Sequence, residues 1–97
     1  MGNNENNLFD REINSIPVIT RFYGITIKMY FNDHLPPHFH AIYGEYNGIF
    51  SIDELSMIED DLPARSIHLV REWGSKYQSE LRKMWETKEF IKLPELD

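Results

Sequence analysis

The sequence predicts an α+β fold, in which an antiparallel meander of about four strands packs on one long C-terminal helix. Three observations support this prediction. Residues 25–31 (ITIKMYF) alternate between apolar and polar, as a half-buried strand does. Residues 38–53 have the pattern of a β-hairpin with its turn at Gly44 and Glu45. From Ile67 onward, apolar residues recur every three or four positions, which indicates an amphipathic helix.

Composition predicts a single domain. The chain has 97 residues, of which 41% are hydrophobic, and this content is sufficient for one core. We expect this domain over residues 15–97, after a flexible, asparagine-rich arm over residues 1–14. The absence of cysteine excludes disulfides, thiolate zinc sites and cysteine nucleophiles. A metal ion would therefore need imidazole or oxygen ligands.

Charge and hydropathy indicate which classes of binding partner are compatible with this chain. No apolar run approaches the roughly 20 residues of a transmembrane helix, and the N-terminus lacks the features of a signal peptide, so we expect a cytoplasmic protein without a membrane partner. The formal net charge of −6 opposes nonspecific binding to nucleic acid. A basic or neutral protein partner suits this charge better, and a homo-oligomer is an open alternative.

The strands can be placed from their turns. We expect a first strand at residues 17–22, a turn at Tyr23 and Gly24, and a second strand at residues 25–31. In the hairpin, glycine at the first central position of the turn sets Tyr43 opposite Tyr46. The register then places Phe39 opposite Phe50 on one face. It places His40 opposite Ile49, and His38 opposite Ser51, on the other face, where Asp53 continues the row.

The second half of the chain is predicted to be a solvated connection followed by the helix. Residues 53–61 carry five acids and no base, with a short extended piece at residues 56–58. Asp61 is the expected N-cap, with Pro63 in the first turn. Gly74 inside the helix either allows close packing against the sheet, which is the favoured interpretation, or marks a bend. The apolar stripe consists of Ile67, Val70, Trp73, Tyr77, Leu81, Met84 and Trp85, and the tail residues Phe90, Ile91 and Leu93 can fold back on the core.

The stretch DHLPPHFH, residues 33–40, holds three of the four histidines. His38 and His40 lie two positions apart on a strand, so their side chains point the same way with Cβ atoms about 7 Å apart. Together with Asp53, or with His34, they would form a two-histidine, one-carboxylate site or a three-histidine site. Such sites bind zinc or iron.

Two other interpretations of the histidines remain open. In the first, the histidines have a structural role and hydrogen-bond backbone groups that the prolines leave unpaired. Alternatively, His40 acts with Arg21 or Lys28 as a metal-free, ribonuclease-like acid/base pair. His68, away from the centre of the stripe, is expected to be a bystander. Nucleotide-binding glycine loops, the elbow-serine motif and the HExxH zinc motif are all absent.

The combination of RFYGI at residues 21–25, HLPPHFH at residues 34–40 and DLP at residues 61–63 resembles the small bacterial domain-of-unknown-function family 4160. The resemblance extends over about residues 16–93. It implies no established activity. It implies a gene arrangement similar to toxin–antitoxin pairs, in which a second small protein is encoded nearby. The leading functional hypothesis is therefore an interaction protein of such a pair that uses the histidine-bearing sheet face. The alternative is a small hydrolase with His38 and His40 at its site.

Overall fold

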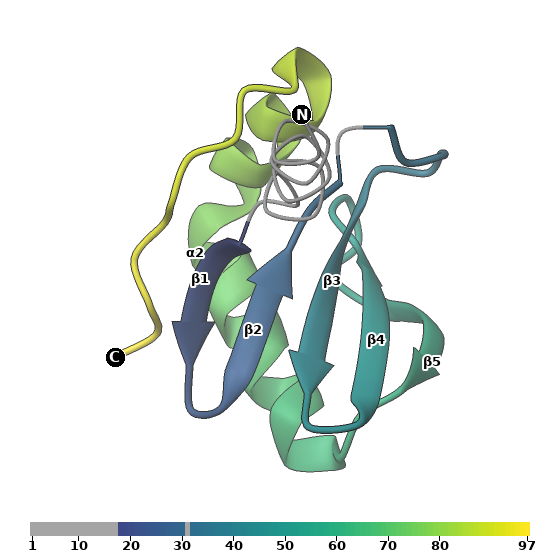
Figure 1. The fold of residues 1–97 in the computed structure, drawn as a ribbon, viewed down its shortest axis with the longest axis vertical. Coiled ribbons are helices and arrows are strands. Elements are labelled where there is room, and N and C mark those ends of the chain that lie inside the picture. Colours follow the sequence, from purple (N-terminus) through teal and green to yellow (C-terminus); the bar gives the residue numbers. More distant parts are fainter. Residues whose placement is uncertain (1–17, 31) are drawn as a thin grey trace, which may run out of the picture.

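The structure, a computed structural model, describes residues 18–30 and 32–97, so the arm expected over residues 1–14 lies outside the described residues. Within these described residues, five antiparallel strands form one sheet in the order β1-β2-β3-β4-β5, and one helix follows (Figure 1). The elements are β1 (Val18–Phe22), β2 (Ile25–Lys28), β3 (His38–Tyr43), β4 (Tyr46–Ser51), β5 (Met57–Asp61) and α2 (Ala64–Thr87). The α+β meander predicted from the sequence is confirmed.

The fifth strand lies in the acidic segment that was expected to be a connection. β5 pairs with β4, and Glu59 lies opposite Ile49. As an edge strand, β5 leaves one side of its backbone unpaired, and charged side chains are favoured at such an edge because they oppose pairing with another chain. The acids of this segment are therefore compatible with a strand, although they weaken the alternation that would have identified it.

Tight turns set the register of the first four strands. Tyr23 and Gly24 both have positive φ (50° and 80°) and form the two-residue turn between Phe22 and Ile25. Gly44 (φ 59°) begins the corresponding turn between β3 and β4. The predicted hairpin register is confirmed, with Tyr43 opposite Tyr46, Phe39 opposite Phe50, His40 opposite Ile49 and His38 opposite Ser51.

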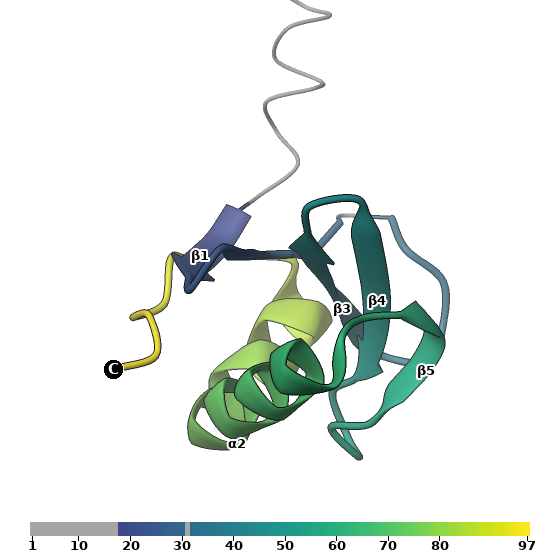
Figure 2. The ribbon, with the colours of Figure 1, turned by 90° about the horizontal axis from the view of Figure 1, so that it is seen from below.

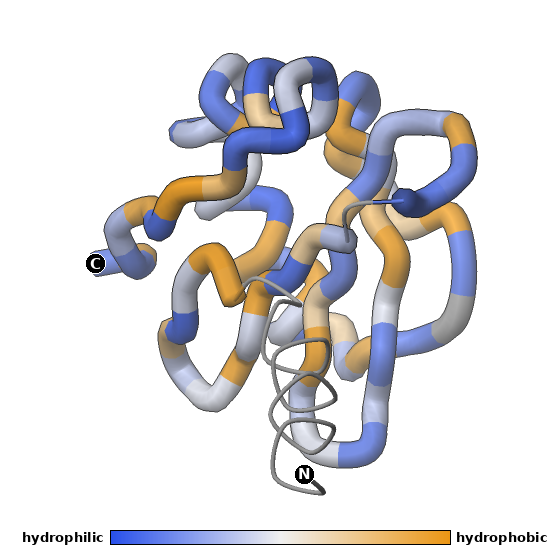
Figure 3. Tube along the Cα trace, turned by 45° about the horizontal axis from the view of Figure 1, so that its top comes forward, coloured by the Kyte–Doolittle hydropathy of each residue, from blue (hydrophilic) through white to orange (hydrophobic). Residues whose placement is uncertain are grey.

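The core lies between the sheet and α2, which covers one face of the sheet (Figure 2). Phe39 stacks on Phe50 with ring centroids 5.5 Å apart, and it contacts Trp73 edge-on at 5.9 Å. A Cβ added to Gly74 would lie 2.9 Å from Cδ2 of Leu55 in the β4–β5 loop and 3.8 Å from Cζ of Phe39 on β3, so this glycine packs closely, mainly against the loop and less closely against the sheet. Along the strands and the helix, hydrophobic and hydrophilic residues alternate (Figure 3), as expected for elements that bury one side.

The helix starts later than expected. Asp61 is the last residue of β5, where it pairs with Asn47, and it is not the N-cap. Leu62 turns into the core, and Pro63 occupies the N-cap position without a side-chain hydrogen bond. The prediction of Asp61 as the cap was wrong because pairing with β4 holds this residue in the sheet.

The C-terminal tail runs beside β1 (Figure 1). The Leu93 N–H donates to the Ile19 carbonyl at 2.9 Å, and the Trp73 Nε1–H donates to the Pro94 carbonyl at 2.8 Å. Leu93 is buried, whereas Ile91 is 57% exposed. Of the tail residues expected to return to the core, Leu93 and the partly buried Phe90 do so. Within residues 18–30 and 32–97, no helix combines the length and the apolar character needed to cross a bilayer.

Candidate metal centre

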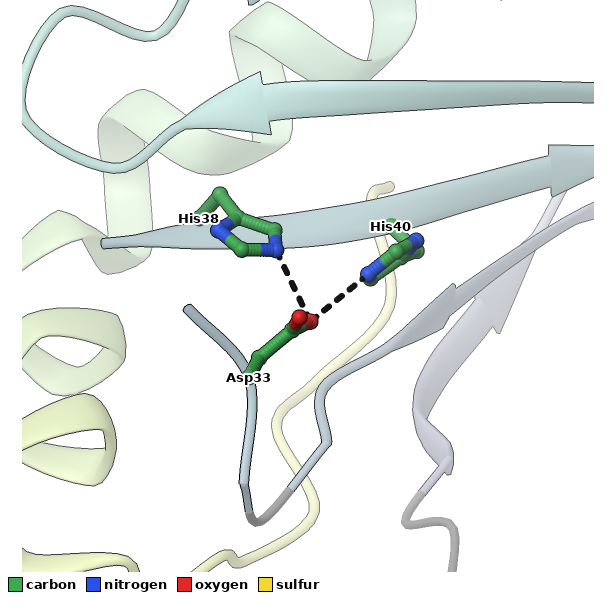
Figure 4. Close-up of side chains that lie close together, drawn as sticks. All are labelled: Asp33, His38 and His40. Carbon is green, nitrogen blue, oxygen red and sulfur yellow. Dashed lines mark hydrogen bonds and ion pairs between the residues drawn. The ribbon is translucent and has the colours of Figure 1, made fainter. Parts of the chain in front are cut away.

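A carboxylate and two imidazoles converge where the β2–β3 loop meets the start of β3 (Figure 4). The loop brings Asp33 back towards the strand, and Oδ2 of Asp33 lies 2.8 Å from Nε2 of His38 and 3.1 Å from Nε2 of His40. The other oxygen, Oδ1, accepts a hydrogen bond from the backbone N–H of His34 at 3.1 Å. One ligand atom from each of Asp33, His38 and His40 lies within 4.8 Å of the other two.

The protonation of His38 follows from its two neighbours. Nδ1 lies 2.7 Å from the carbonyl oxygen of Pro36, which can only accept, so Nδ1 carries a proton. Nε2 faces the carboxylate of Asp33, which also only accepts when it is ionised. Nε2 of His38 and Oδ2 of Asp33 attract each other only if a positive charge lies between them. That charge is either a proton or a metal ion.

Burial distinguishes the three side chains. His38 is 2% exposed and packs against Trp85 of α2, with ring centroids 5.2 Å apart. Asp33 is 17% exposed and His40 is 12% exposed, so the cluster is closed on the helix side and partly open on the other. The register predicted from the sequence places both rings on the face opposite Phe39, yet His38 also contacts α2. The difference for His38 arises because the last turns of α2 reach the end of the sheet where β3 begins (Figure 1).

His40 lies beside Tyr30, whose ring contacts it edge-on at 4.5 Å. Burial lowers the pKa of His40, and the neighbouring Asp33 carboxylate only partly opposes this shift. Nδ1 of His40 is buried and has no hydrogen-bond partner among the described residues. This ring is therefore held largely neutral near pH 7, the form in which imidazole binds a metal ion.

The pKa of Asp33 is lowered. Burial alone would raise it, but hydrogen bonds with His40 and His38, the charge of His38 and the N–H of His34 outweigh burial. The pKa of Tyr30 is raised, first by burial and then by the negative charge of Asp33, so its phenol stays protonated. The cluster thus combines an ionised carboxylate, a neutral His40 and a protonated phenol at neutral pH.

The arrangement fits a divalent transition metal. Tetrahedral zinc with Zn–N and Zn–O distances near 2.0–2.1 Å places its ligand atoms about 3.3 Å apart. The two separations from Oδ2, 2.8 and 3.1 Å, would widen by up to about half an ångström, and the two histidine nitrogens, which lie within 4.8 Å of each other, would take up the same spacing. The contact between His38 Nδ1 and the Pro36 carbonyl is the type of outer hydrogen bond that orients a metal-binding histidine. The structural role expected for the histidines and a metal role are compatible, because they use different nitrogens.

The other expected ligands lie at different distances from this cluster. His34 is 84% exposed. Its Nδ1 lies 3.4 Å from Oδ1 of Asp33, and its ring centroid is 5.4 Å from that of His38, so it borders the cluster on the solvent side. Asp53 does not join the cluster, since its carboxylate pairs with Arg82 at 2.7 Å. The row of Ser51 ends there because the chain turns at residues 52–54, and the Ser51 hydroxyl accepts the Glu54 N–H.

The two candidate cations also differ in position. Lys28 is the cross-strand partner of His40 on β3, which places a half-buried positive charge next to the cluster. Arg21 is exposed on β1 and pairs with Thr26, two strands and two residues away from His40, or about 12 Å at ordinary sheet spacings. His68 is 81% exposed on the helix, near Glu72, as expected for a bystander.

Sequence reasoning missed Asp33. Its signal was its position at the start of the same short stretch, five residues before His38. The alternation of side chains along a strand shows which residues of that strand share a face. It does not predict the path by which a proline-containing loop returns to the strand. The Leu35–Pro36 peptide bond in this loop is cis.

Comparison with known proteins gives one match. The family model "Domain of unknown function (DUF4160)" matches residues 24–86, which include the β2–β3 loop, the three clustered side chains and nearly all of α2. Neither the curated proteins nor the solved structures gave a match.

Proposed function

Since the chain belongs to the DUF4160 family, whose description assigns no activity, its function must come from its own site, and we propose a divalent-metal-dependent hydrolase. Asp33, His38 and His40 would hold the ion. The observation that carries this proposal is the convergence of their three ligand atoms within 4.8 Å. Zinc and iron(II) both suit a set of two imidazoles and one carboxylate.

Three protein ligands leave at least one position for water, as in catalytic rather than structural metal sites. A bound metal ion would lower the pKa of that water and so supply a hydroxide nucleophile near neutral pH. The chain's own groups would do the rest. Asp33 and His40 are partly exposed, so a substrate can approach from the solvent side. Lys28, opposite His40, supplies a positive charge suited to an anionic substrate such as a phosphodiester.

Metal binding is tested first. Protein purified without a nickel column and stripped with EDTA is titrated with Zn²⁺ by calorimetry, and with Co²⁺ by its visible absorption. We expect one equivalent to bind, with Asp33→Asn abolishing binding and Asp53→Asn leaving it intact. Equal binding by the wild type and Asp33→Asn would remove the basis of the proposal.

Hydrolysis is tested separately with bis(4-nitrophenyl) phosphate and a single-stranded RNA between pH 5 and 8. We expect cleavage that requires metal and Asp33. Metal binding without cleavage of either substrate would show that the protein binds a metal ion, and it would refute the proposed hydrolase activity. Cleavage that persists in EDTA and depends on His40 and Lys28 would favour the metal-free acid/base pair instead.

A second candidate is an interaction role in a toxin–antitoxin-like pair. It is supported by the sheet face that α2 does not cover (Figure 2), where Ile42 and Ile49 are half-buried next to Lys28 and His40. Co-purification with the product of the neighbouring gene tests it. Ile49→Asp should release the partner, whereas Lys76→Asp on the exposed side of the helix should not. A complex that survives both Ile49→Asp and His40→Asp would refute docking on this face.

A further inference from the structure

A second site candidate lies at the opposite end of β3 from the metal cluster. A cleft of about 270 Å³ is lined by Tyr23, Tyr43, Arg65, Ser66 and Leu69. It lies between the turn that joins β1 to β2, the end of β3 and the first turn of α2. A Cβ at Gly24 would lie 3.2 Å from Cε1 of Tyr43, so the glycine allows the Tyr43 ring to rest on this turn and wall the cleft.

The first turn of α2 presents unpaired donors to this region. Its N-cap is Pro63, which makes no side-chain cap, and the first turn contains no acidic residue. The Ile67 N–H is the first to bond back, to the Pro63 carbonyl at 3.1 Å. The N–H groups of residues 64–66 therefore have no acceptor among the described residues. The N-terminal end of a 24-residue helix also carries a partial positive charge.

Ser66 is an independent sign of a ligand. It occupies the core-facing stripe of the helix, one turn before Val70, yet it is polar and only 5% exposed. Its hydroxyl has no hydrogen-bond partner within residues 18–30 and 32–97, and its side chain lines the cleft. Among the described residues, Nδ1 of His40 is the only fully buried side-chain polar atom without a partner, so the Ser66 hydroxyl reaches the surface of the cleft, where it can bond to a ligand.

We propose that this cleft binds a phosphate monoester, with the phosphate held by the first turn of α2. The free N–H groups and the Ser66 hydroxyl donate to the phosphate oxygens, and the Arg65 guanidinium supplies the opposite charge in a geometry that matches phosphate. The rings of Tyr23 and Tyr43 contact the organic part of the ligand. The cleft volume limits that part to a small group, because drug-sized ligands occupy about 300–1,000 Å³.

The site is tested by ¹H–¹⁵N NMR titration in EDTA, so that the metal cluster does not contribute. The probes are inorganic phosphate and phenyl phosphate, each compared with NaCl at the same ionic strength. We expect the amide signals of residues 64–66 to shift with both probes, at lower concentrations for phenyl phosphate. Shifts of equal size in NaCl would overturn the site. Binding of inorganic phosphate without a preference for the ester would overturn the monoester assignment.

Variants locate the anion. Arg65→Gln should weaken binding about tenfold, the size expected for loss of one charge-assisted contact, and Ser66→Ala should also weaken it. Arg71→Gln removes the same charge from an exposed position farther along the helix, and it should change binding less than about twofold. Equal losses for Arg65→Gln and Arg71→Gln would indicate general electrostatic attraction, and wild-type binding by Ser66→Ala would exclude contact at the first turn.

Discussion

Asp33→Asn is the most informative substitution, because it keeps the shape of the side chain but removes the charge that two histidines share. Oδ2 of Asp33 faces Nε2 of His38 at 2.8 Å and Nε2 of His40 at 3.1 Å. If a metal ion occupies this position, loss of the carboxylate removes one of three ligands. Even outer-shell partners of metal ligands change affinity by about 10–100-fold, so we expect a loss of at least about 100-fold.

The same substitution affects the metal-free protein. A hydrogen bond to a charged group contributes about 1.5–3 kcal/mol, and Asp33 takes part in two such contacts within a mostly buried cluster, so the free energy of unfolding should fall by about 2–4 kcal/mol. Urea unfolding in EDTA measures this change, and Zn²⁺ calorimetry measures the affinity. The matched control is Asp53→Asn, which loses an exposed pair with Arg82 worth at most about 1 kcal/mol. Metal loss in Asp53→Asn but not in Asp33→Asn would refute the assignment.

Three further predictions concern acid, packing and the tail. In EDTA, the free energy of unfolding should fall as the pH drops below about 6.5, because the lowered pKa of His40 makes the folded state bind protons less readily than the unfolded state, and His40→Asn should flatten this slope. Gly74→Leu should destabilise the fold by about 1–3 kcal/mol in urea through overpacking against Leu55, whereas Lys76→Leu should be nearly neutral. Trp73→Phe removes the hydrogen bond to Pro94, so limited proteolysis should release the tail faster than in the wild type.

The local rules predicted the sheet well where one geometric constraint was sufficient. The two-residue turn at Gly44 fixed every pair of β3 and β4, because a register error of one residue would have turned Phe39 away from the core. The helix followed from its stripe, although Tyr77, three residues after Gly74, interrupts it with non-helical angles (φ −120°, ψ 23°). β5 escaped prediction because its acids belong to an edge strand, where alternation is not required.

The sequence predicted the two histidines of the candidate site but not its carboxylate, and this difference has a physical cause. His38 and His40 come together through the pleat of a single strand, a relation that spacing alone reveals. The carboxylate comes from a loop, whose path depends on backbone angles at each residue and is not periodic. Extending the strand pattern to Asp53 selected a residue that the chain had already turned away, towards Arg82.

The three ligands come from a loop and a strand, so metal binding should affect how firmly the β2–β3 loop is held against β3. His38 is fixed on β3 by Trp85 on one side and by the Pro36 carbonyl on the other, so it forms the rigid part of the cluster. Asp33 lies in the β2–β3 loop, and its Oδ2 contacts the side chains of His38 and His40 on β3. An ion that bound all three groups would therefore tie the β2–β3 loop to the strand and add its binding free energy to the stability of this end of the sheet. Amide hydrogen exchange in the loop should slow on addition of Zn²⁺, while exchange at the far end of β3 should not. A uniform change over the whole sheet would mean that the ion acts elsewhere.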